Sequence, residues 1–232
     1  MQYHSSKEKM DLARVAVHEA GHAITTFSCN KVVDITSVYI ESNNGGVFYT
    51  TNNVNTAEFN YALMVMSLAG LAAEIIVYNK CNPIHAEKDL NNTLNALELL
   101  ITQDLTSISI SESKTDISKM YSRSFSNLEK RLLNSAFNDA KNIINAFGEK
   151  YFKLVSLLLT KIKISQSDIE NILGSRIFIK LSGQMPKTDV YFYYPRNKSN
   201  KPIIGRIKQW LNNNLFLRLQ KFLTRSIRML NS

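Results

Sequence analysis

The sequence contains little cysteine, glycine or proline. Its two cysteines, Cys29 and Cys81, cannot form the framework of several disulfides that stabilises small secreted domains, so we expect a reducing compartment. Eight glycines and four prolines exclude collagen-like and proline-rich material. A hydrophobic fraction of 44% in 232 residues is too high for a disordered chain. The sequence therefore predicts one globular domain with an appendage of about 40 residues.

Long hydrophobic runs are also lacking. No stretch of 18 consecutive apolar residues occurs, so the sequence predicts no membrane-spanning helix. The first 14 residues contain no apolar segment of the kind found in secretory signals. Together with the cysteine content, these features predict a cytoplasmic protein.

Acidic residues are absent from the end of the chain. Residues 190–232 hold nine of the 28 lysines and arginines and no aspartate or glutamate, which leaves 19 basic and 19 acidic residues in 1–189. The net charge of +9 therefore belongs to the C-terminal segment. Such an asymmetry favours a basic tail that meets an anionic surface over a protein that binds nucleic acid as a whole.

The composition predicts three parts. We expect a helical domain over 1–174, a linker with glycine and proline over 175–202, and a basic amphipathic helical tail over 203–232. Four basic residues of the tail fall on one helical stripe beside apolar side chains: Arg218, Lys221, Arg225 and Arg228. This tail can lie peripherally on an anionic membrane, pack on its own domain with a solvated basic face, dock on a partner, or bind nucleic acid, the least favoured choice.

Within 1–174 the hydrophobic periodicity predicts a mainly α fold with a small β-hairpin. The predicted helices cover 7–27, 56–79, 87–104, 128–147 and 150–162, and a short helical turn covers 165–173. The predicted strands cover 33–41 and 47–51, on either side of a turn at 42–46. The helix over 56–79 is very apolar, so we expect it at the centre, with Gly70 allowing close packing.

The segment His18-Glu19-Ala20-Gly21-His22 carries the clearest chemical signal. Two histidines four residues apart lie on one face of a helix, where both rings can bind one metal ion. Imidazole suits Zn²⁺, and a catalytic zinc takes three protein ligands and leaves one position for water. Glu19 is placed to take a proton from that water. The alternative is a helix whose two histidines bind no metal.

The motif does not identify the third ligand. The candidates are Glu74, Asp89, His85 and, less favoured, Glu87. Glu74 lies in the apolar helix, where an unpaired carboxylate would be costly, so it must bind the metal or hydrogen-bond a metal-bound histidine. Asp89 is predicted near a helix start, where the helix dipole alone favours an acid. Spacing does not decide between them.

Three segments of the sequence resemble the peptidase domain of the FtsH-type AAA zinc metalloproteases. They are ARVAVHEAGHA at 13–23, LAGLAAE at 68–74 and AEKDL at 86–90, the last followed by Thr93. Their order and spacing match that family, and the helices over 127–173 resemble its closing helical segment. The resemblance covers about 7–174.

The resemblance implies a helical zinc-peptidase domain with specific roles. His18, His22 and Asp89 would bind Zn²⁺, Glu19 would be the general base, and Glu74 would hold a ligand histidine in place. Peptides or unfolded proteins would be the substrates. Lys88 stands where the family usually has asparagine, which is a departure from its pattern.

The sequence lacks the family's ATPase module, because none of its glycines begins a phosphate-binding G-x-x-x-x-G-K-[ST] loop. We therefore expect a free-standing peptidase that reaches only short or flexible substrates, unless a separate ATPase feeds it. Whether the family's homo-oligomeric ring persists stays open.

Two alternatives also stay open. The strand region over 46–51 can pair with an extended substrate or be an ordinary structural hairpin. The chain can also be a catalytically idle binding or adaptor protein that acts through its basic tail, although the intact Glu19 argues against this.

Overall fold

A computed structural model of the chain describes residues 6–29, 33–41, 44–51, 55–81, 83–106, 108, 110 and 115–174. The side chains of 6–11 and 83–85 are outside this description. All described residues belong to the first of two compact units, 1–198 and 199–232. The predicted linker and the predicted basic tail, from residue 175 onwards, lie outside the described residues.

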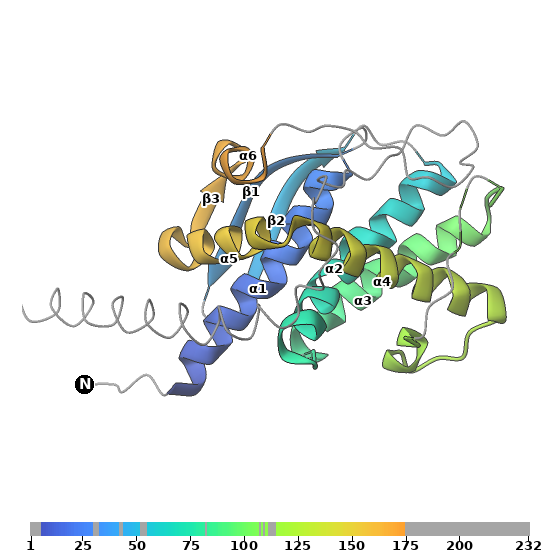
Figure 1. Ribbon diagram of the computed structural model, residues 1–232. Coiled ribbons are helices and arrows are strands. Elements are labelled where there is room, and N and C mark those ends of the chain that lie inside the picture. The colour runs from blue at the N-terminus through green and yellow to red at the C-terminus, as the bar shows by residue number, and fades with distance from the viewer. Residues whose placement is uncertain are drawn as a thin grey trace, which may run out of the picture. The chain divides into compact units, whose positions relative to one another are not determined.

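The described residues are mainly helical (Figure 1). In chain order the elements are α1 (Ser6–Ser28), β1 (Val33–Glu41), β2 (Asn44–Thr51), α2 (Ala57–Tyr78), α3 (Pro83–Ile101), the 3-10 helix η1 (Ile117–Met120), α4 (Asn127–Phe147), α5 (Glu149–Lys161), β3 (Lys163–Ser165) and α6 (Gln166–Leu173). The predicted mainly α fold with a small β component is confirmed.

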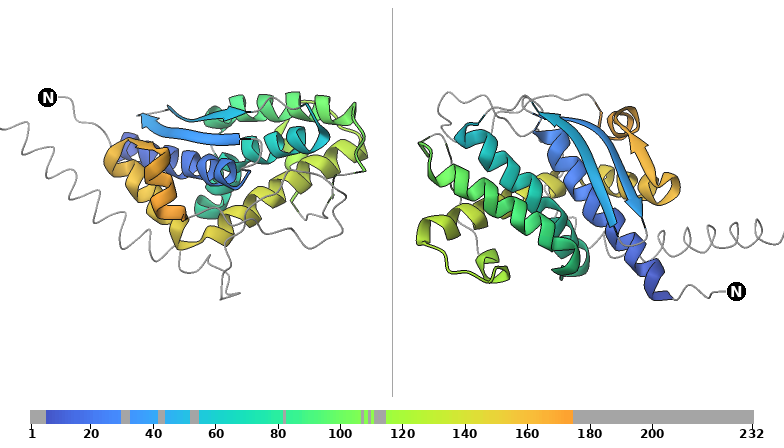
Figure 2. Two further views of the ribbon diagram at one scale, coloured as in Figure 1. Left: turned by 90° about the horizontal axis from the view of Figure 1, so that it is seen from above. Right: turned by 180° about the vertical axis from the view of Figure 1, so that it is seen from behind.

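The β component is a three-stranded antiparallel sheet in the order β2-β1-β3, rather than a hairpin alone. Strand β3 was not predicted, because three residues are too few to show an alternating pattern. Ile164 of β3 is fully buried and pairs with Val38 of β1. The hairpin strands lie over α1 (Figure 2), which contacts both of them.

Strand β2 begins earlier than predicted. Gly45 and Gly46 belong to the strand and pair with Ile40 and Tyr39, whereas the sequence suggested a turn over 42–46. The prediction was wrong here because two adjacent glycines are a strong turn signal. Because these two residues have no side chains, the backbone of β2 can approach Glu19 of α1 closely at Gly45.

Helix α2 is the centre of the described fold, in contact with α1, α3 and α4. The Thr56 side chain caps it by accepting from the Phe59 amide. By length and composition alone α2 could cross a membrane, a possibility that the search for uninterrupted apolar runs did not raise. However, 72% of its most apolar window is buried, as expected for a central core helix.

Helix α3 extends from Pro83 to Ile101, whereas the prediction placed it over 87–104. Proline suits the first turn of a helix, because its missing N–H has no helical acceptor there. Asp89 is therefore the seventh residue of α3 and not a first-turn acid. The helix dipole does not explain it, so another role for this carboxylate is needed.

Helix α5 supports α1 directly behind the histidine motif. Tyr151 is almost fully buried, and its hydroxyl donates a 2.8 Å hydrogen bond to the Val17 carbonyl. Burial raises the pKa of Tyr151 well above its usual value, so the hydroxyl stays a donor. This bond fixes the turn of α1 that carries His18.

Candidate metal centre

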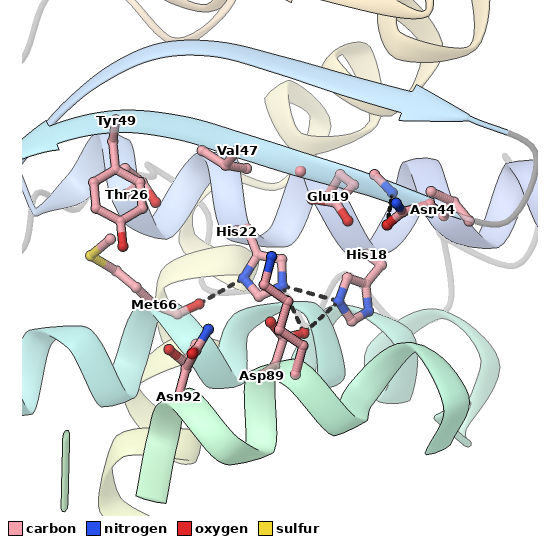
Figure 3. A pocket seen from close by; sticks show the side chains of 15 residues that line it. His18, Glu19, His22, Thr26, Asn44, Val47, Tyr49, Met66, Asp89 and Asn92 are labelled. Atoms are coloured by element: carbon pink, nitrogen blue, oxygen red, sulfur yellow. Dashed lines mark hydrogen bonds and ion pairs between the residues drawn. The ribbon is translucent and has the colours of Figure 1, made fainter. Parts of the chain in front are cut away.

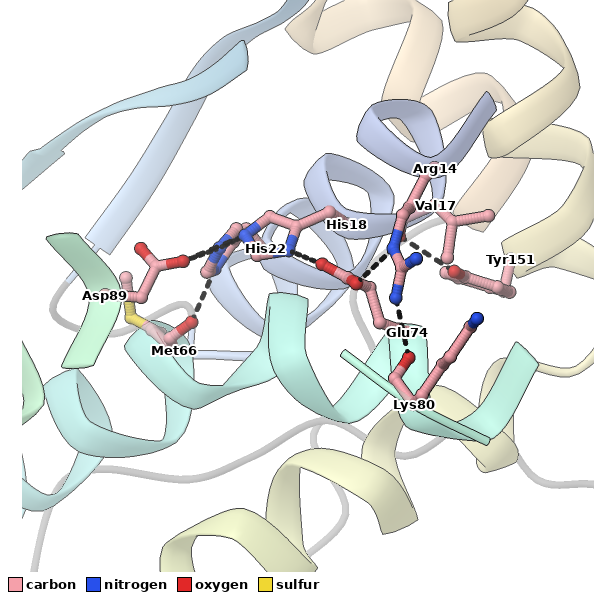
Figure 4. A network of polar contacts seen from close by, with 9 residues as sticks. All are labelled: Arg14, Val17, His18, His22, Met66, Glu74, Lys80, Asp89 and Tyr151. Carbon is pink, nitrogen blue, oxygen red and sulfur yellow. Dashed lines mark hydrogen bonds and ion pairs between the residues drawn. The ribbon is translucent and has the colours of Figure 1, made fainter. Parts of the chain in front are cut away.

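Helices α1 and α2 pack side by side, so that successive turns of α1 contact successive turns of α2. Arg14, His18 and His22 are spaced four residues apart on one face of α1. They meet three positions of α2 that are also four residues apart: Glu74, Gly70 and Met66. This pairing of two faces positions both histidine rings (Figure 4).

Three potential ligand atoms converge at one point. Nε2 of His18 lies 2.8 Å from Oδ2 of Asp89 and 3.0 Å from Nε2 of His22. Nε2 of His22 lies 3.1 Å from the same Asp89 oxygen. Asp89 reaches this point from α3, across the pocket from β2 (Figure 3). Among the described residues, this is the group of histidine and acidic side chains that could hold a metal ion.

The other nitrogen of each ring is already hydrogen-bonded. Nδ1 of His22 lies 2.7 Å from the Met66 carbonyl, which can only accept, so Nδ1 carries the proton. Nδ1 of His18 lies 2.7 Å from Oε1 of Glu74 and donates to it in the same way. Each neutral ring therefore presents the lone pair of Nε2 to the convergence point.

This donor set fits a zinc ion. Two lone pairs and a carboxylate oxygen repel each other at about 3 Å unless a proton or cation lies between them. Zinc bonds of about 2.0–2.1 Å in a tetrahedron place ligand atoms about 3.4 Å apart. A shift of only a few tenths of an ångström would open the three atoms to that spacing, and their types are those that Zn²⁺ accepts.

The pKa values of the cluster also indicate that positive charge is favoured at this point. Burial lowers the pKa of His18, but hydrogen bonds with Asp89 and Glu74 outweigh it and raise the pKa to about 10. Burial raises the pKa of Asp89, but the neighbouring His22 and His18 hold it well below its usual value. Without a metal, these pKa shifts favour a protonated His18 beside an ionised Asp89.

Glu19 lies beside this cluster and is only 7% exposed. A Cβ added at Gly45 would lie 2.5 Å from its Cγ and 2.8 Å from its Oε1, so the backbone of β2 passes directly over this carboxylate. Burial is the main cause that raises the pKa of Glu19 above its usual value. A carboxyl group with a raised pKa suits proton exchange with water near neutral pH.

Glu74 does not join the three converging atoms but holds His18 from behind. Its Oε1 accepts from His18, and its Oε2 lies 2.6 Å from Nε of Arg14. Arg14 also donates to the Lys80 carbonyl at 2.9 Å and lies over the Tyr78 ring. Burial raises the pKa of Glu74, but the His18 and Arg14 hydrogen bonds outweigh it and keep this pKa low.

Gly70 provides the space for the His18 ring. A Cβ at this position would lie 2.3–2.5 Å from three atoms of the imidazole. Only glycine therefore lets the ring lie flat against α2 at this height. The predicted close packing at Gly70 is confirmed, and the neighbour, which was not predicted, is the His18 ring.

The remaining third-ligand candidates lie elsewhere or are not described. Glu87 is exposed and takes no part in the cluster. The side chain of His85 lies outside the described residues.

Both cysteines are free thiols. Cys29 is buried, and burial raises its pKa to about 12.

A pocket of about 430 Å³ opens onto the cluster. One wall is the β2 segment Asn44–Val47 together with Tyr49, and the opposite wall is the α3 face with Lys88, Asp89 and Asn92. Met66 and Thr26 contribute further lining. The site is therefore an open groove between α3 and β2, which is an edge strand among the described residues (Figure 3).

Three residues of the site had no predicted role: Arg14, Gly45 and Lys88. Arg14 precedes His18 by four residues, so its place on the same helix face was a readable signal. The approach of Gly45 to Glu19 depends on the strand register and has no such signal. Lys88 was noted only as a departure from the family pattern.

The chain is similar in sequence to a bacterial zinc metalloprotease. The ATP-dependent zinc metalloprotease FtsH of Parabacteroides distasonis is 27% identical to this chain over 188 residues. The match covers 74% of the chain but only 27% of the length of that protein. No family model matches the chain. These findings indicate a distant relationship to FtsH.

Proposed function

We propose that this chain is a zinc-dependent endopeptidase that hydrolyses peptide bonds. The observation that carries the proposal is the convergence of His18, His22 and Asp89 with both Nδ1 atoms already donating. This arrangement leaves three ligand atoms on one side of the site and an open groove on the other. A zinc ion with three protein ligands and an open position is the catalytic form of that metal.

When bound, zinc would act as a Lewis acid toward water and the peptide carbonyl. His18, His22 and Asp89 would hold it, while Glu74 and Met66 fix the orientation of the two rings. Glu19 would accept the proton of the attacking water at a carboxylate oxygen and then deliver it to the leaving amine. The raised pKa of Glu19 suits both halves of this transfer.

The groove supports a peptide as substrate. In the described part of the sheet, β2 is an edge strand beside the cluster. An extended peptide can add to such an edge through main-chain hydrogen bonds. This interaction favours flexible or unfolded chains, so the peptidase would act without ATP on short substrates and would need a separate ATPase for folded ones.

The test compares the purified wild type with Glu19→Gln. We expect both proteins to retain one zinc per chain, because Glu19 is not among the converging ligand atoms. Casein and peptide cleavage should fall by at least about a hundredfold in the variant, as expected for loss of a general base. Glu87→Gln changes an exposed carboxylate of α3 outside the pocket and is the matched control, with activity unchanged.

Equal inactivity of the wild type and Glu19→Gln on a broad peptide set, with zinc bound in both, would contradict the enzyme proposal. That result would favour the alternative, an idle relative that binds a partner. Activity that survives complete removal of zinc would contradict the metal part of the proposal.

A further inference from the structure

We propose that Lys88 makes this groove selective for peptides with an acidic side chain next to the scissile bond. The inference rests on the proposed peptidase function, because it names the substrate class of the same site. It depends on the position of Lys88 in the groove and on the balance of charges there.

Lys88 lines the same pocket as His18, His22 and Asp89. It directly precedes Asp89 on α3 and lines the pocket together with Asn92, one helical turn further on. The opposite wall is the edge strand β2, along which an extended peptide would lie. A substrate in this groove therefore has β2 on one side and Lys88 on the other.

The ammonium group of Lys88 is available to a ligand. Its residue is exposed, and it forms no ion pair with a described residue. Glu87 is its neighbour in sequence but does not line the pocket, and adjacent helical residues do not face each other.

The positive charge of Lys88 is not balanced by the other charges in the groove. The histidine, acidic and basic residues that line it are His18, His22, Glu19, Asp89 and Lys88. A divalent ion is neutralised by Glu19 and Asp89, and both histidines are neutral as metal ligands. The remaining net charge is that of Lys88. An anionic substrate side chain is therefore attracted into the groove, and a cationic one is repelled.

The test uses full-length, zinc-loaded protein and peptides that differ at one residue beside the cleaved bond, either Glu, Gln or Lys. We expect kcat/KM of the wild type to favour Glu over Gln by about fivefold, a ratio typical of a partly exposed charge pair. Lys88→Met should bring this ratio close to one, and Lys88→Glu should invert it. Lys153→Met removes an equal charge from the exposed side of α5 and should leave the preference unchanged.

The basic tail could also cause a preference for Glu peptides, and the Lys88 variants distinguish its effect from that of Lys88. A preference for Glu that persists in Lys88→Met belongs to the tail or to the overall charge and would overturn the proposal. A wild type that cleaves Glu, Gln and Lys peptides equally would also overturn it, while leaving the peptidase function intact.

A binding measurement separates failure of the inference from failure of the proposed function. The same peptides are titrated by fluorescence anisotropy into zinc-loaded Glu19→Gln, with and without Lys88→Met. Tighter binding of the Glu peptide that disappears with Lys88→Met supports the role of Lys88 even if no peptide is cleaved. Equal affinities for the Glu and Lys peptides would refute it.

Discussion

Nδ1 of His18 lies 2.7 Å from Oε1 of Glu74, and the opposite nitrogen of the same ring faces Asp89. One imidazole therefore lies between two carboxylates with different tasks. Glu74 orients the ring and is itself held by Arg14, whereas Asp89 shares the convergence point with both histidines. In the proposed function, Asp89 would therefore bind the metal and Glu74 would support the ring.

The first prediction follows from this division. Asp89→Ala should abolish stoichiometric zinc binding, because it removes one of three ligands. Glu74→Ala should retain the site and weaken zinc affinity by about 10–100-fold, as expected for loss of a ligand-orienting partner. Zinc content after dialysis and competition with a chelator measure both effects. The reverse order would make Glu74 the third ligand.

The second prediction concerns two glycines that accommodate site residues. Gly70→Ala places a methyl group against the His18 ring, and we expect zinc affinity to fall by at least about tenfold. Gly45→Ala pushes instead against Glu19, so zinc should stay bound while kcat falls. Titration with zinc and steady-state kinetics of both variants distinguish the two effects. Unchanged zinc affinity in Gly70→Ala would show that the ring does not lie against α2.

The third prediction concerns Asp139 of α4, which accepts a 2.8 Å hydrogen bond from the Tyr61 hydroxyl. Burial raises the pKa of this carboxyl from 3.8 to about 6. The neutral form is therefore favoured in the folded state, and its stabilising contribution is lost as the pH rises from 3.8 to about 6.

The side chain of Asp139→Asn stays neutral at every pH. As the pH rises across that range, the unfolding free energy of the variant should therefore increase relative to that of the wild type by up to about 3 kcal/mol. Urea unfolding at several pH values measures the difference, with Glu41→Gln on the exposed end of β1 as the control. A difference that does not vary with pH would contradict burial of an ionisable group at this position.

The fourth prediction concerns the basic tail, which lies outside the described residues. Removal of 203–232 takes away six basic residues and no acidic one. We expect peptidase activity to remain and binding to anionic phosphatidylserine vesicles to be lost. Flotation of vesicles with and without the anionic lipid measures this. Equal vesicle binding by the shortened protein would remove the membrane from the list of partners.

Much of the fold was predictable because long amphipathic segments dominate it. The periodicity of α1, α2, α4 and α5 placed these helices within one or two residues of their observed ends. The three-residue strand β3 and the early start of β2 were missed, because their short sequences carry no period and Gly45-Gly46 indicates a turn. Register and strand pairing depend on tertiary contacts that local patterns do not contain.

For the site, the helical spacing of His18 and His22 predicted that the two rings lie close together, which the structure confirms; a shared ion stays a prediction. The buried setting of Glu74 required a partner, and His18 and Arg14 are its partners. The choice between Asp89 and Glu74 was not available from spacing, because it depends on how α3 packs against α2 beside the two histidines. Local reasoning placed Asp89 in a first turn, and only the extension of α3 to Pro83 removed that explanation.

The most direct test of the account is a crystal structure of the zinc-loaded protein with anomalous data on both sides of the zinc absorption edge. We expect one strong peak about 2.0–2.2 Å from Nε2 of His18, Nε2 of His22 and a carboxylate oxygen of Asp89. Glu74 should remain hydrogen-bonded to Nδ1 of His18. Absence of a peak between the two rings in zinc-saturated crystals, with the imidazoles turned apart, would contradict the account.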